Sequence, residues 1–330
     1  MRRTPMIQLD SVTIQYGPIR AVDTVSLDVE AGEIFGLLGP NGSGKSSTLA
    51  AIAGILRPVS GRIRIQQHCI RDKAEVCARQ IGFVPQEIAL YEELSVWENL
   101  RFFGELYGLS GRFLHQRMEI SLHTVQMMPR AQQSVGTLSG GLQRRVNLAC
   151  ALLHDPAVLL LDEPCVALDP CSREVLFNTL SSLRQQGKAI ILTTHHLEDA
   201  EQWCDRVGVL LQGKLIALDR PARLFHEIPH KTVVLGQLRL HLAEQLEQIA
   251  RSRLGKDIAF EVWGKQIRIE APSQELMGRA LATLCTTGIE LESFRTPPAR
   301  LDRILEESAA AATEPAILPF PTEKGEAWAA

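Results

Sequence analysis

The feature that most constrains the fold of this chain is a glycine-rich octapeptide after a short apolar run. Residues 39–46 match the pattern G-x-x-x-x-G-K-[ST], between a strand predicted at 34–38 and a helix ending near Gly54. The glycines let such a loop turn its N–H groups toward phosphates, and the helix N-terminus adds positive potential. An ordinary glycine-rich loop is the alternative. The motif predicts nucleotide binding at Gly39, Pro40, Asn41, Gly42, Ser43, Gly44, Lys45, Ser46 and Ser47. Lys45 would bridge the β- and γ-phosphates, and the Ser46 hydroxyl would bind Mg²⁺.

Length and composition limit the possible classes of protein. The 330 residues predict two domains, or one large domain with an appendage, and the 45% hydrophobic share is typical of a folded globular chain. A formal net charge of -3 argues against a general nucleic-acid binder. No apolar run approaches the roughly 18–20 residues that would span a bilayer, and no secretory signal follows the first residues. None of the 7 cysteines forms a Cys-x-x-Cys pair, which favours reduced thiols in the cytoplasm.

From residue 11 to about 218, short β-branched runs alternate with stretches of helical period. Continuous apolar runs predict strands covered on both faces, and Gly187 ends a crossover helix at 172–186. Two further helical stretches predict a helical insert within the domain. This order predicts an α/β fold with a mainly parallel sheet. The strands are expected at 81–84, 158–161 and 189–193, and the insert helices at 96–107 and 112–127.

The pattern changes after Pro229. The order of predicted elements is β-α-β-β-α-β, that of the split βαβ or ferredoxin-like arrangement, and a looser β-rich appendage is the alternative. A turn at Gly264 and Lys265 would join the two middle strands. The six elements are expected at 231–235, 241–253, 257–262, 266–270, 273–285 and 290–294, followed by a helix at 300–307. The Ala- and Pro-rich residues 309–330 predict a flexible tail.

Two carboxylates follow the strand predicted at 158–161. The end of a buried parallel strand lies at the sheet edge where ligands bind in open α/β folds. There, Asp162 can hold Mg²⁺ through water, and Glu163 can polarise an attacking water. A simple turn is the alternative for this pair alone, but the phosphate loop favours the catalytic interpretation.

A second helix start carries residues suited to phosphate. Ser139 is a predicted N-cap before a helix at 144–153, and helix capping alone is the alternative. Gly140 and Gly141 are poor helix formers, which indicates that the backbone approaches another group closely. Two such helix starts would crowd one triphosphate. We therefore expect two chains to pair head to tail, so that the second start of one caps the nucleotide of the other.

These motifs, in this order, resemble the ATP-binding subunit of an ABC transporter over about residues 7–218. The match rests on five motifs in order: the phosphate loop at 39–46, the sequence Leu-Ser-Gly-Gly-x-Gln at 138–143, the strand with its two carboxylates at 158–163, the Leu-Asp pair at 168–169, and His195. The resemblance implies that Tyr16 stacks on adenine and that Gln86 touches Mg²⁺ and the attacking water. It further implies that His195, rather than the adjacent His196, contacts the γ-phosphate. The nucleotide contacts that it assigns to the second helix start and the loop between sites are Ser139, Gly140, Gly141, Gln143 and Asp169.

Three further stretches, 91–100, 141–156 and 193–206, resemble bacterial exporters of the daunorubicin-resistance and sodium-export type. In that group the ATPase is a separate chain from a six-helix permease, and many chains carry a small C-terminal domain. The sequence departs from the family at Ser47, Cys165 and Ala167, and we expect Cys165 to confer sensitivity to thiol reagents. The domains expected are an ATP-binding domain at 1–228 with its helical insert at about 87–155, an accessory domain at 229–308 and a tail at 309–330.

The resemblance thus implies a P-loop cassette that hydrolyses ATP to ADP and phosphate with Mg²⁺. Its partners would be a second copy or a related cassette and a membrane permease, with no nucleic acid, on the inner face of the cell membrane. The alternatives are a soluble ABC ATPase acting on ribosomes or DNA, and a regulatory pseudo-ATPase. The sequence does not identify the transported molecule.

Overall fold

The computed structural model describes residues 5–166, 168–226, 232–238, 258–263, 266–286 and 291–295. The chain divides into two compact units, Met1–Ala222 and Arg223–Ala330, and each is treated by itself. Of the predicted elements, the helices at 241–253 and 300–307, the turn at 264–265 and the tail at 309–330 lie outside the described residues.

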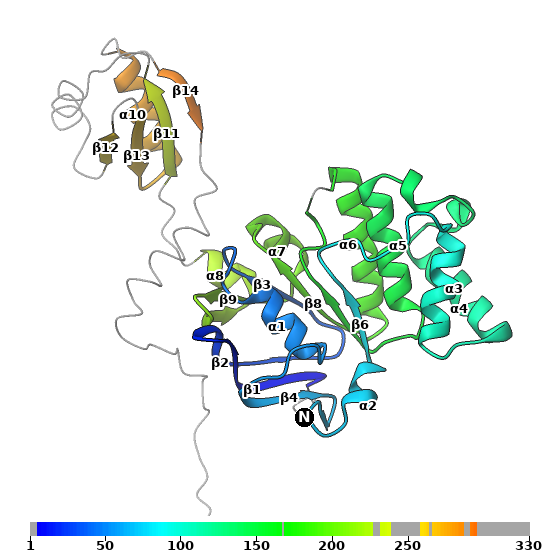
Figure 1. The fold of residues 1–330 in the computed structure, drawn as a ribbon. Helices are drawn as coiled ribbons and strands as arrows, with labels where there is room; N and C mark the ends of the chain where they lie inside the picture. Colours follow the sequence, from blue (N-terminus) through cyan, green and yellow to red (C-terminus); the bar gives the residue numbers. More distant parts are fainter. Residues whose placement is uncertain are drawn as a thin grey trace, which may run out of the picture. The chain divides into compact units, whose positions relative to one another are not determined.

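A six-stranded sheet forms the centre of the described part of the first unit, in the order β10-β9-β3-β8-β7-β6 (Figure 1). The strands from β9 to β6 run parallel, and β10 is antiparallel to β9. The strands predicted at 34–38, 81–84 and 158–161 are confirmed, and the one predicted from 189 extends by one residue to Thr194. The bounds are β3 (Ile34–Leu38), β6 (Ile81–Val84), β7 (Val158–Leu161), β8 (Ala189–Thr194), β9 (Arg206–Leu211) and β10 (Lys214–Asp219).

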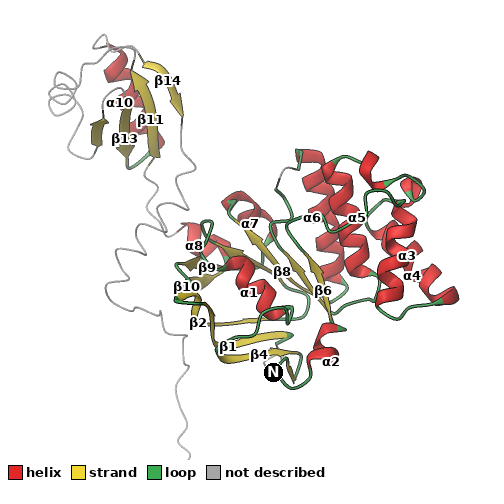
Figure 2. Cartoon of the chain, viewed as in Figure 1, coloured by secondary structure: helices red, strands yellow, loops and turns green. Residues whose placement is uncertain are grey.

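Four further strands form an antiparallel sheet in the order β2-β1-β4-β5, which the sequence patterns did not separate from the first sheet. Its apolar side chains join those of the central sheet in one core that includes Leu9, Val25, Phe35 and Leu160. Helix α1 lies between the two sheets (Figure 2). The bounds are β1 (Ile7–Tyr16), β2 (Ile19–Val29), β4 (Ser60–Ile65), β5 (His68–Cys69) and α1 (Lys45–Ile52).

The helical insert follows β6. Ser95 caps its first helix through a capping box with Glu98, so the sequence fixes this start locally. The second helix ends at Thr124, three residues before the predicted end, because Gln126 adopts a φ of 58° that no helix continues. The third begins at Gly140, directly after Ser139, rather than at 144. The bounds are α3 (Val96–Leu106), α4 (Gly111–Thr124) and α5 (Gly140–Leu152), with short 3₁₀ turns at Met128–Arg130 and Val135–Thr137.

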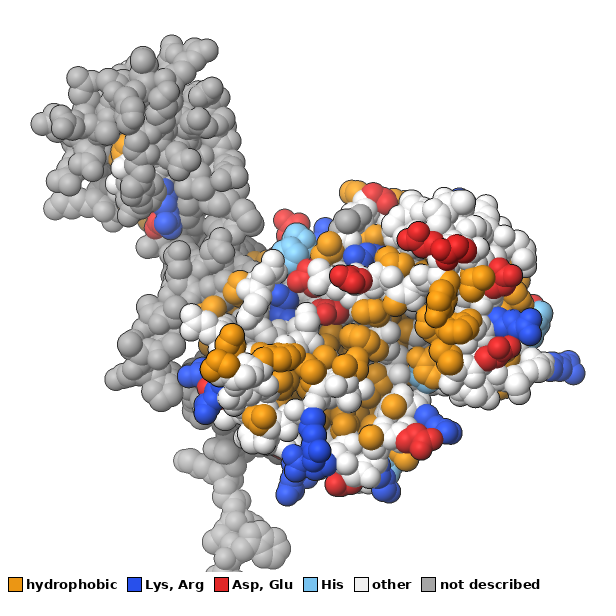
Figure 3. Space-filling view, viewed as in Figure 1, with side chains coloured by type: hydrophobic (Ala, Val, Ile, Leu, Met, Phe, Trp, Pro, Cys, Tyr) orange, Lys and Arg blue, Asp and Glu red, His pale blue; other side chains and the backbone are white. Residues whose placement is uncertain are grey.

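The insert exposes large apolar side chains. Figure 3 shows hydrophobic side chains gathered on the part of the surface over α3 and α4. Three rings in or beside the first insert helix, Tyr91, Phe102 and Phe103, pack edge-on or tilted against one another. The exposed large apolar residues of the insert, together called the insert patch below, are Tyr91, Phe102, Leu106, Tyr107, Phe113 and Ile120.

Of the remaining described helices, α6 and α7 follow strands of the central sheet, α2 follows β5, and α8 contains the boundary between the two units. Asp169 caps the crossover helix, and Pro170 occupies its first turn, where a missing N–H costs nothing. The bounds are α2 (Ala74–Ala78), α6 (Pro170–Gln185), α7 (Leu197–Trp203) and α8 (Pro221–His226).

In the second unit, the described strands form an antiparallel sheet in the order β12-β13-β11-β14. One helix packs on it through Met277, Ala280 and Leu284, which meet Ile267 and Ile269. The strands and this helix lie within one to three residues of their predicted starts and ends. The bounds are β11 (Thr232–Leu238), β12 (Ala259–Trp263), β13 (Gln266–Ala271), α10 (Gln274–Thr286) and β14 (Leu291–Arg295).

Candidate active site

The glycine-rich loop joins β3 to α1 in a conformation that only glycine can adopt at two of its positions. Gly39 and Gly44 have φ values of 156° and 105°, and a Cβ at either would lie 2.3 Å from a main-chain carbonyl oxygen. Those carbonyls belong to Leu210 and Ala21, so the central and antiparallel sheets both confine the loop. The loop therefore presents its backbone rather than side chains to a ligand.

Lys45 is the buried charge at the centre of this loop. Its Nζ donates to the carbonyl oxygens of Gly39 at 2.8 Å and Pro40 at 3.1 Å. It also lies 3.5 Å from Oε1 of Glu163. The loop thus folds back around the lysine, whose side chain is only 5% exposed.

The two strand-end carboxylates are positioned by a neighbouring strand. The Thr193 hydroxyl, on β8, donates to Oδ1 of Asp162 at 2.6 Å and accepts from the Glu163 amide at 2.8 Å. Thr193 was absent from the predicted site. The available signal was a polar residue near the end of an otherwise apolar strand. Glu163 itself adopts a φ of 45°, a left-handed conformation that is uncommon for a residue with a side chain.

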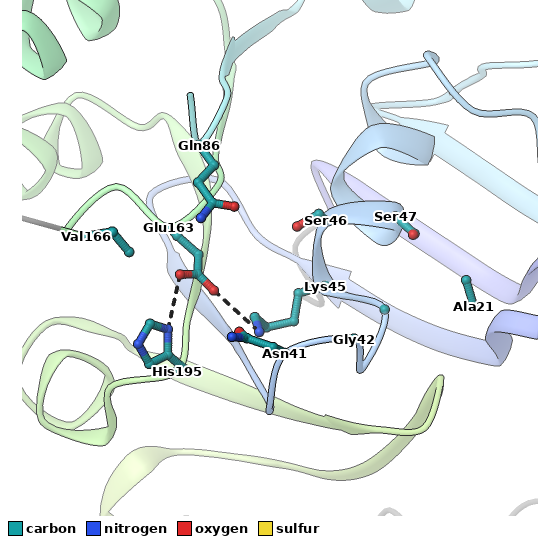
Figure 4. Close-up of a pocket in the computed structure, with 11 residues that line it drawn as sticks. Ala21, Asn41, Gly42, Lys45, Ser46, Ser47, Gln86, Glu163, Val166 and His195 are labelled. Atoms are coloured by element: carbon teal, nitrogen blue, oxygen red, sulfur yellow. Dashed lines mark hydrogen bonds and ion pairs between the residues drawn. The ribbon is translucent and has the colours of Figure 1, made fainter. Parts of the chain in front are cut away.

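Glu163 lies between two cationic or proton-carrying groups. Its Oε1 faces Lys45, and its Oε2 lies 3.1 Å from Nδ1 of His195. Figure 4 shows the three side chains pointing toward one another, with Gln86 beside them. They border a cavity of about 630 Å³ lined by Ala21, Asn41, Gly42, Gly44, Lys45, Ser46, Ser47, Gln86, Glu163, Val166 and His195. The cavity therefore combines a phosphate-binding loop with an acid–base pair.

The adjacent histidines differ in surroundings. His195 lines the cavity, whereas His196 does not, although the ring centroids are 4.1 Å apart. Burial, followed by the neighbouring His195, lowers the pKa of His196 below its usual range.

Oxygen donors suited to Mg²⁺ lie at this site. Ser46 and Gln86 line the cavity and supply a hydroxyl and an amide oxygen. Asp162 is buried and adds a carboxylate that Thr193 orients. Proteins commonly bind Mg²⁺ through one or two carboxylates together with substrate phosphates, so this donor set fits the ion. No group of three or more His, Cys, Asp or Glu side chains that could hold a metal occurs among the residues described.

Tyr16 ends β1 beside the first turn of α1. Its ring is 47% exposed, and its hydroxyl lies 3.4 Å from Oγ of Ser47, which lines the cavity. An exposed aromatic face at the cavity mouth is suited to stacking on a base.

The second helix start lies elsewhere. In the part of the chain that the structure describes, the cavity lining includes none of Ser139, Gly140, Gly141, Gln143 and Asp169. Ser139 occupies the N-cap position of α5 without a capping bond from its side chain, and nothing lies within 4 Å of a Cβ placed on Gly140. The hydroxyl and the first helical N–H groups are thus open to a ligand from outside this protomer's cavity.

The other three residues of this set are engaged within the chain. A Cβ on Gly141 would lie 2.8 Å from Oγ of Ser172, so the close approach that required glycine is to α6. Gln143 donates its side-chain amide to the Val135 carbonyl at 3.0 Å. Asp169 accepts from the amide and the hydroxyl of Ser172, and these bonds hold the pKa of its carboxyl below the usual range.

Cys165 lies two residues after Glu163. Burial raises the pKa of its thiol to about 12. A protonated, buried thiol reacts slowly, which argues against the sensitivity to thiol reagents expected at this position.

Comparison with known sequences places these motifs in a family. A family model described as ABC transporter matches residues 22–166. The linearmycin resistance ATP-binding protein LnrL of Bacillus subtilis (strain 168) is 38% identical over 302 residues, which cover 91% of this chain and 96% of that protein. The Nod factor export ATP-binding protein I of Sinorhizobium fredii is 41% identical over 221 residues, 67% of this chain and 64% of that relative.

Solved structures share the fold of the first unit. The bacterial ABC transporter cassette MJ0796, solved as a dimer, superposes with a TM-score of 0.60 at 30% identity, covering 66% of this chain and 99% of that one. The same cassette has also been solved in a post-hydrolysis state bound to ADP and phosphate.

Proposed function

This chain belongs to the ABC transporter ATP-binding family, and we propose that it powers export by a separate permease through ATP-dependent, head-to-tail pairing of two cassettes. It is an ATPase of that family, converting ATP and water to ADP and phosphate. The observation that carries the proposal is the convergence of Lys45, Glu163 and His195 on one cavity beside the phosphate loop.

The chain's own groups divide the chemistry between binding and proton transfer. The loop N–H groups and Lys45 would bind the phosphates, whose oxygens replace the contact that Lys45 makes with Glu163. Glu163, once released, is the base that accepts a proton from the attacking water. His195 would donate to the γ-phosphate and keep the carboxylate of Glu163 in place.

Ser46, Gln86 and Asp162 would hold Mg²⁺, since Ser46 and Gln86 line the cavity and Asp162 directly precedes Glu163, which also lines it. When bound, Mg²⁺ would neutralise charge on the β- and γ-phosphates. Tyr16 would stack on the adenine, which fits its exposed ring next to Ser47.

A second copy of the chain would complete each site. Ser139 and Gly140 present a free hydroxyl and helix N–H groups outward, yet neither lines the cavity of its own protomer. In a head-to-tail pair they would reach the partner's nucleotide, with Gly141, Gln143 and Asp169 shaping that surface from within. The dimer of the MJ0796 cassette supports this arrangement.

Coupling to a permease would use the helical insert. The insert patch exposes aromatic and aliphatic side chains, and a partner surface of apolar helices would cover them. Among the described residues, no helix is long and apolar enough to cross a bilayer. We place the chain on the inner face of the cell membrane, held there by the permease. The names of the relatives, linearmycin resistance and Nod factor export, support export as the direction.

The pairing can be tested with the full-length chain. Light scattering of Glu163→Gln should give a monomer without nucleotide and a dimer in Mg²⁺ and ATP. Cysteines placed by Asn41→Cys and Ser139→Cys, on a Cys171→Ser background, should crosslink between protomers under the same condition. A chain that stays monomeric with every nucleotide would overturn the composite site. Phosphate release with and without the co-expressed permease tests the coupling, and no release in either case would indicate a pseudo-ATPase.

A further inference from the structure

An ion pair with a buried carboxylate and a partly exposed guanidinium joins the helices that follow two loops of the site. Arg173 on α6 contacts Oδ1 of Asp199 on α7 through Nη2, and the Asp199 side chain is 4% exposed. Arg173 lies four residues after Asp169, and Asp199 lies four residues after His195. No role in the site was assigned to either residue from the sequence.

The pair is held by a single contact. Oδ2 of Asp199 and Nε of Arg173 are both buried and have no hydrogen-bond partner in the described part of the chain. Buried polar atoms without partners are costly, so a small shift between α6 and α7 that adds or removes a second bond changes the energy substantially. Buried ion pairs contribute little to folding compared with apolar packing, and a role in fixing geometry accounts better for this one.

The pair also reaches back toward the reacting groups. Burial raises the pKa of the Cys165 thiol and the charge of Arg173 lowers it, and Cys165 lies two residues after Glu163. On the other side, α7 begins two residues after His195, whose Nδ1 lies 3.1 Å from Glu163. Arg173 therefore interacts with groups that follow both members of the acid–base pair.

The same helix start packs against the second phosphate-binding segment. Ser172, next to Arg173, lies so close to Gly141 that a Cβ there would meet its Oγ at 2.8 Å. Gly141 is the second residue of α5 and directly follows Ser139, the N-cap, and Gly140. Packing of Gly141 on Ser172 and the Arg173–Asp199 contact thus link the segment that would face the partner's nucleotide to α7, the helix that follows His195 in the chain.

We propose that Arg173 and Asp199 are positioning residues that transmit the state of the Ser139 segment to His195. This inference rests on the proposed function, because it requires two sites in a head-to-tail dimer. When the partner's nucleotide engages Ser139, α5 presses on Ser172, the Arg173–Asp199 contact adjusts, and α7 sets the distance from His195 to Glu163. Coupling between the two ATP sites of a dimer affects the cooperativity of ATP binding more than the affinity of either site for ATP.

The test compares two arginines on the same helix in the full-length protein. Arg173→Met breaks the proposed link. Arg184→Met instead breaks the ion pair between Arg184 and Asp205. The side chain of Arg184 is as exposed as that of Arg173, but it lies at the other end of α6. Each variant is measured for melting temperature, kcat, KM and the Hill coefficient for ATP. Arg173→Lys, which keeps the charge and one donor, tests rescue.

We expect Arg173→Met to lower kcat about tenfold and to bring the Hill coefficient close to one, with KM within about twofold. Arg173→Lys should recover most of both values, and Arg184→Met should lose melting temperature without these kinetic changes. Equal kinetics for the two methionine variants would overturn the inference. If Arg173→Met fails to fold, Asp199→Asn carries the same comparison. Absence of dimerisation or hydrolysis in the wild-type chain would instead refute the proposed function.

Discussion

Glu163→Gln separates two roles that the structure gives to one carboxylate. The substitution keeps the shape and an oxygen that can accept from Lys45, but it removes the negative charge and the proton acceptor. Without nucleotide, the variant should therefore lose part of the stability that the charge contact gives. With ATP, it should bind phosphate more tightly than the wild type and hydrolyse it far more slowly.

The distances set the size of these effects. Two unit charges 3.5 Å apart, as for Lys45 Nζ and Glu163 Oε1, attract by about 5 kcal/mol at an effective dielectric constant near 20, before any desolvation cost. Because Lys45 keeps two carbonyl partners, we expect a net loss of about 2 kcal/mol, or roughly 4–8 °C in melting temperature. In the wild type, phosphate binding must first break the contact between Lys45 and Glu163, which costs the same roughly 2 kcal/mol. The variant does not pay this cost, so its affinity for ATP should be about thirtyfold higher than that of the wild type. Loss of the base should lower kcat by about 10²–10⁴-fold.

The assay is thermal unfolding with and without Mg²⁺ and ATP, combined with phosphate release. Glu33→Gln is the matched control, because Glu33 is as buried as Glu163 and pairs with Arg206 at 3.2 Å away from the cavity. The control should lose stability equally in both conditions and keep its kcat. Two results would refute the reasoning: phosphate release at the wild-type rate, or the same gain in melting temperature from ATP in Glu163→Gln and Glu33→Gln.

Three shorter predictions follow from other contacts. Thr193→Val should cost about 1–3 kcal/mol of unfolding free energy and lower kcat, whereas Thr193→Ser keeps the hydroxyl and should restore both in melting and phosphate-release assays. Gly141→Ala should lower the melting temperature and abolish ATP-driven dimerisation measured by light scattering, because its Cβ would meet Ser172. Gly140→Ala should leave the melting temperature unchanged, and equal melting temperatures of the two variants would contradict the packing argument. Burial raises the pKa of the Cys165 thiol to about 12, so N-ethylmaleimide should modify the exposed Cys171 first; equal labelling by mass spectrometry would show that Cys165 is accessible.

The sequence predicted β3, β6, β7 and β8 of the central sheet closely, because these strands are short and mostly apolar, but it predicted neither β9 nor β10. Periodicity alone did not separate the second sheet, since β1 and β2 pair with each other and with β4 through contacts distant in sequence. The start of α5 was placed late because two glycines oppose a helix locally. The packing of Gly141 on Ser172 outweighs that preference.

In the site, motif spacing predicted which residues carry reactive groups but not how they are supported. Thr193 belongs to no recognised motif. It supports Asp162 because β8 pairs with β7, and this pairing cannot be read from the sequence around Thr193. The Arg173–Asp199 contact is of the same kind. Supporting residues depend on which strands and helices become neighbours, and neighbouring strands leave little trace in a single sequence.

The left-handed backbone at Glu163 has a consequence for protein engineering. At a φ of 45° a residue with a side chain is strained, at a cost of about 1 kcal/mol, and the contact with Lys45 offsets that cost. Glu163→Gly would relieve the strain but would leave the buried Lys45 without its counter-charge, so laboratory selection for heat resistance alone should find no advantage in removing the carboxylate.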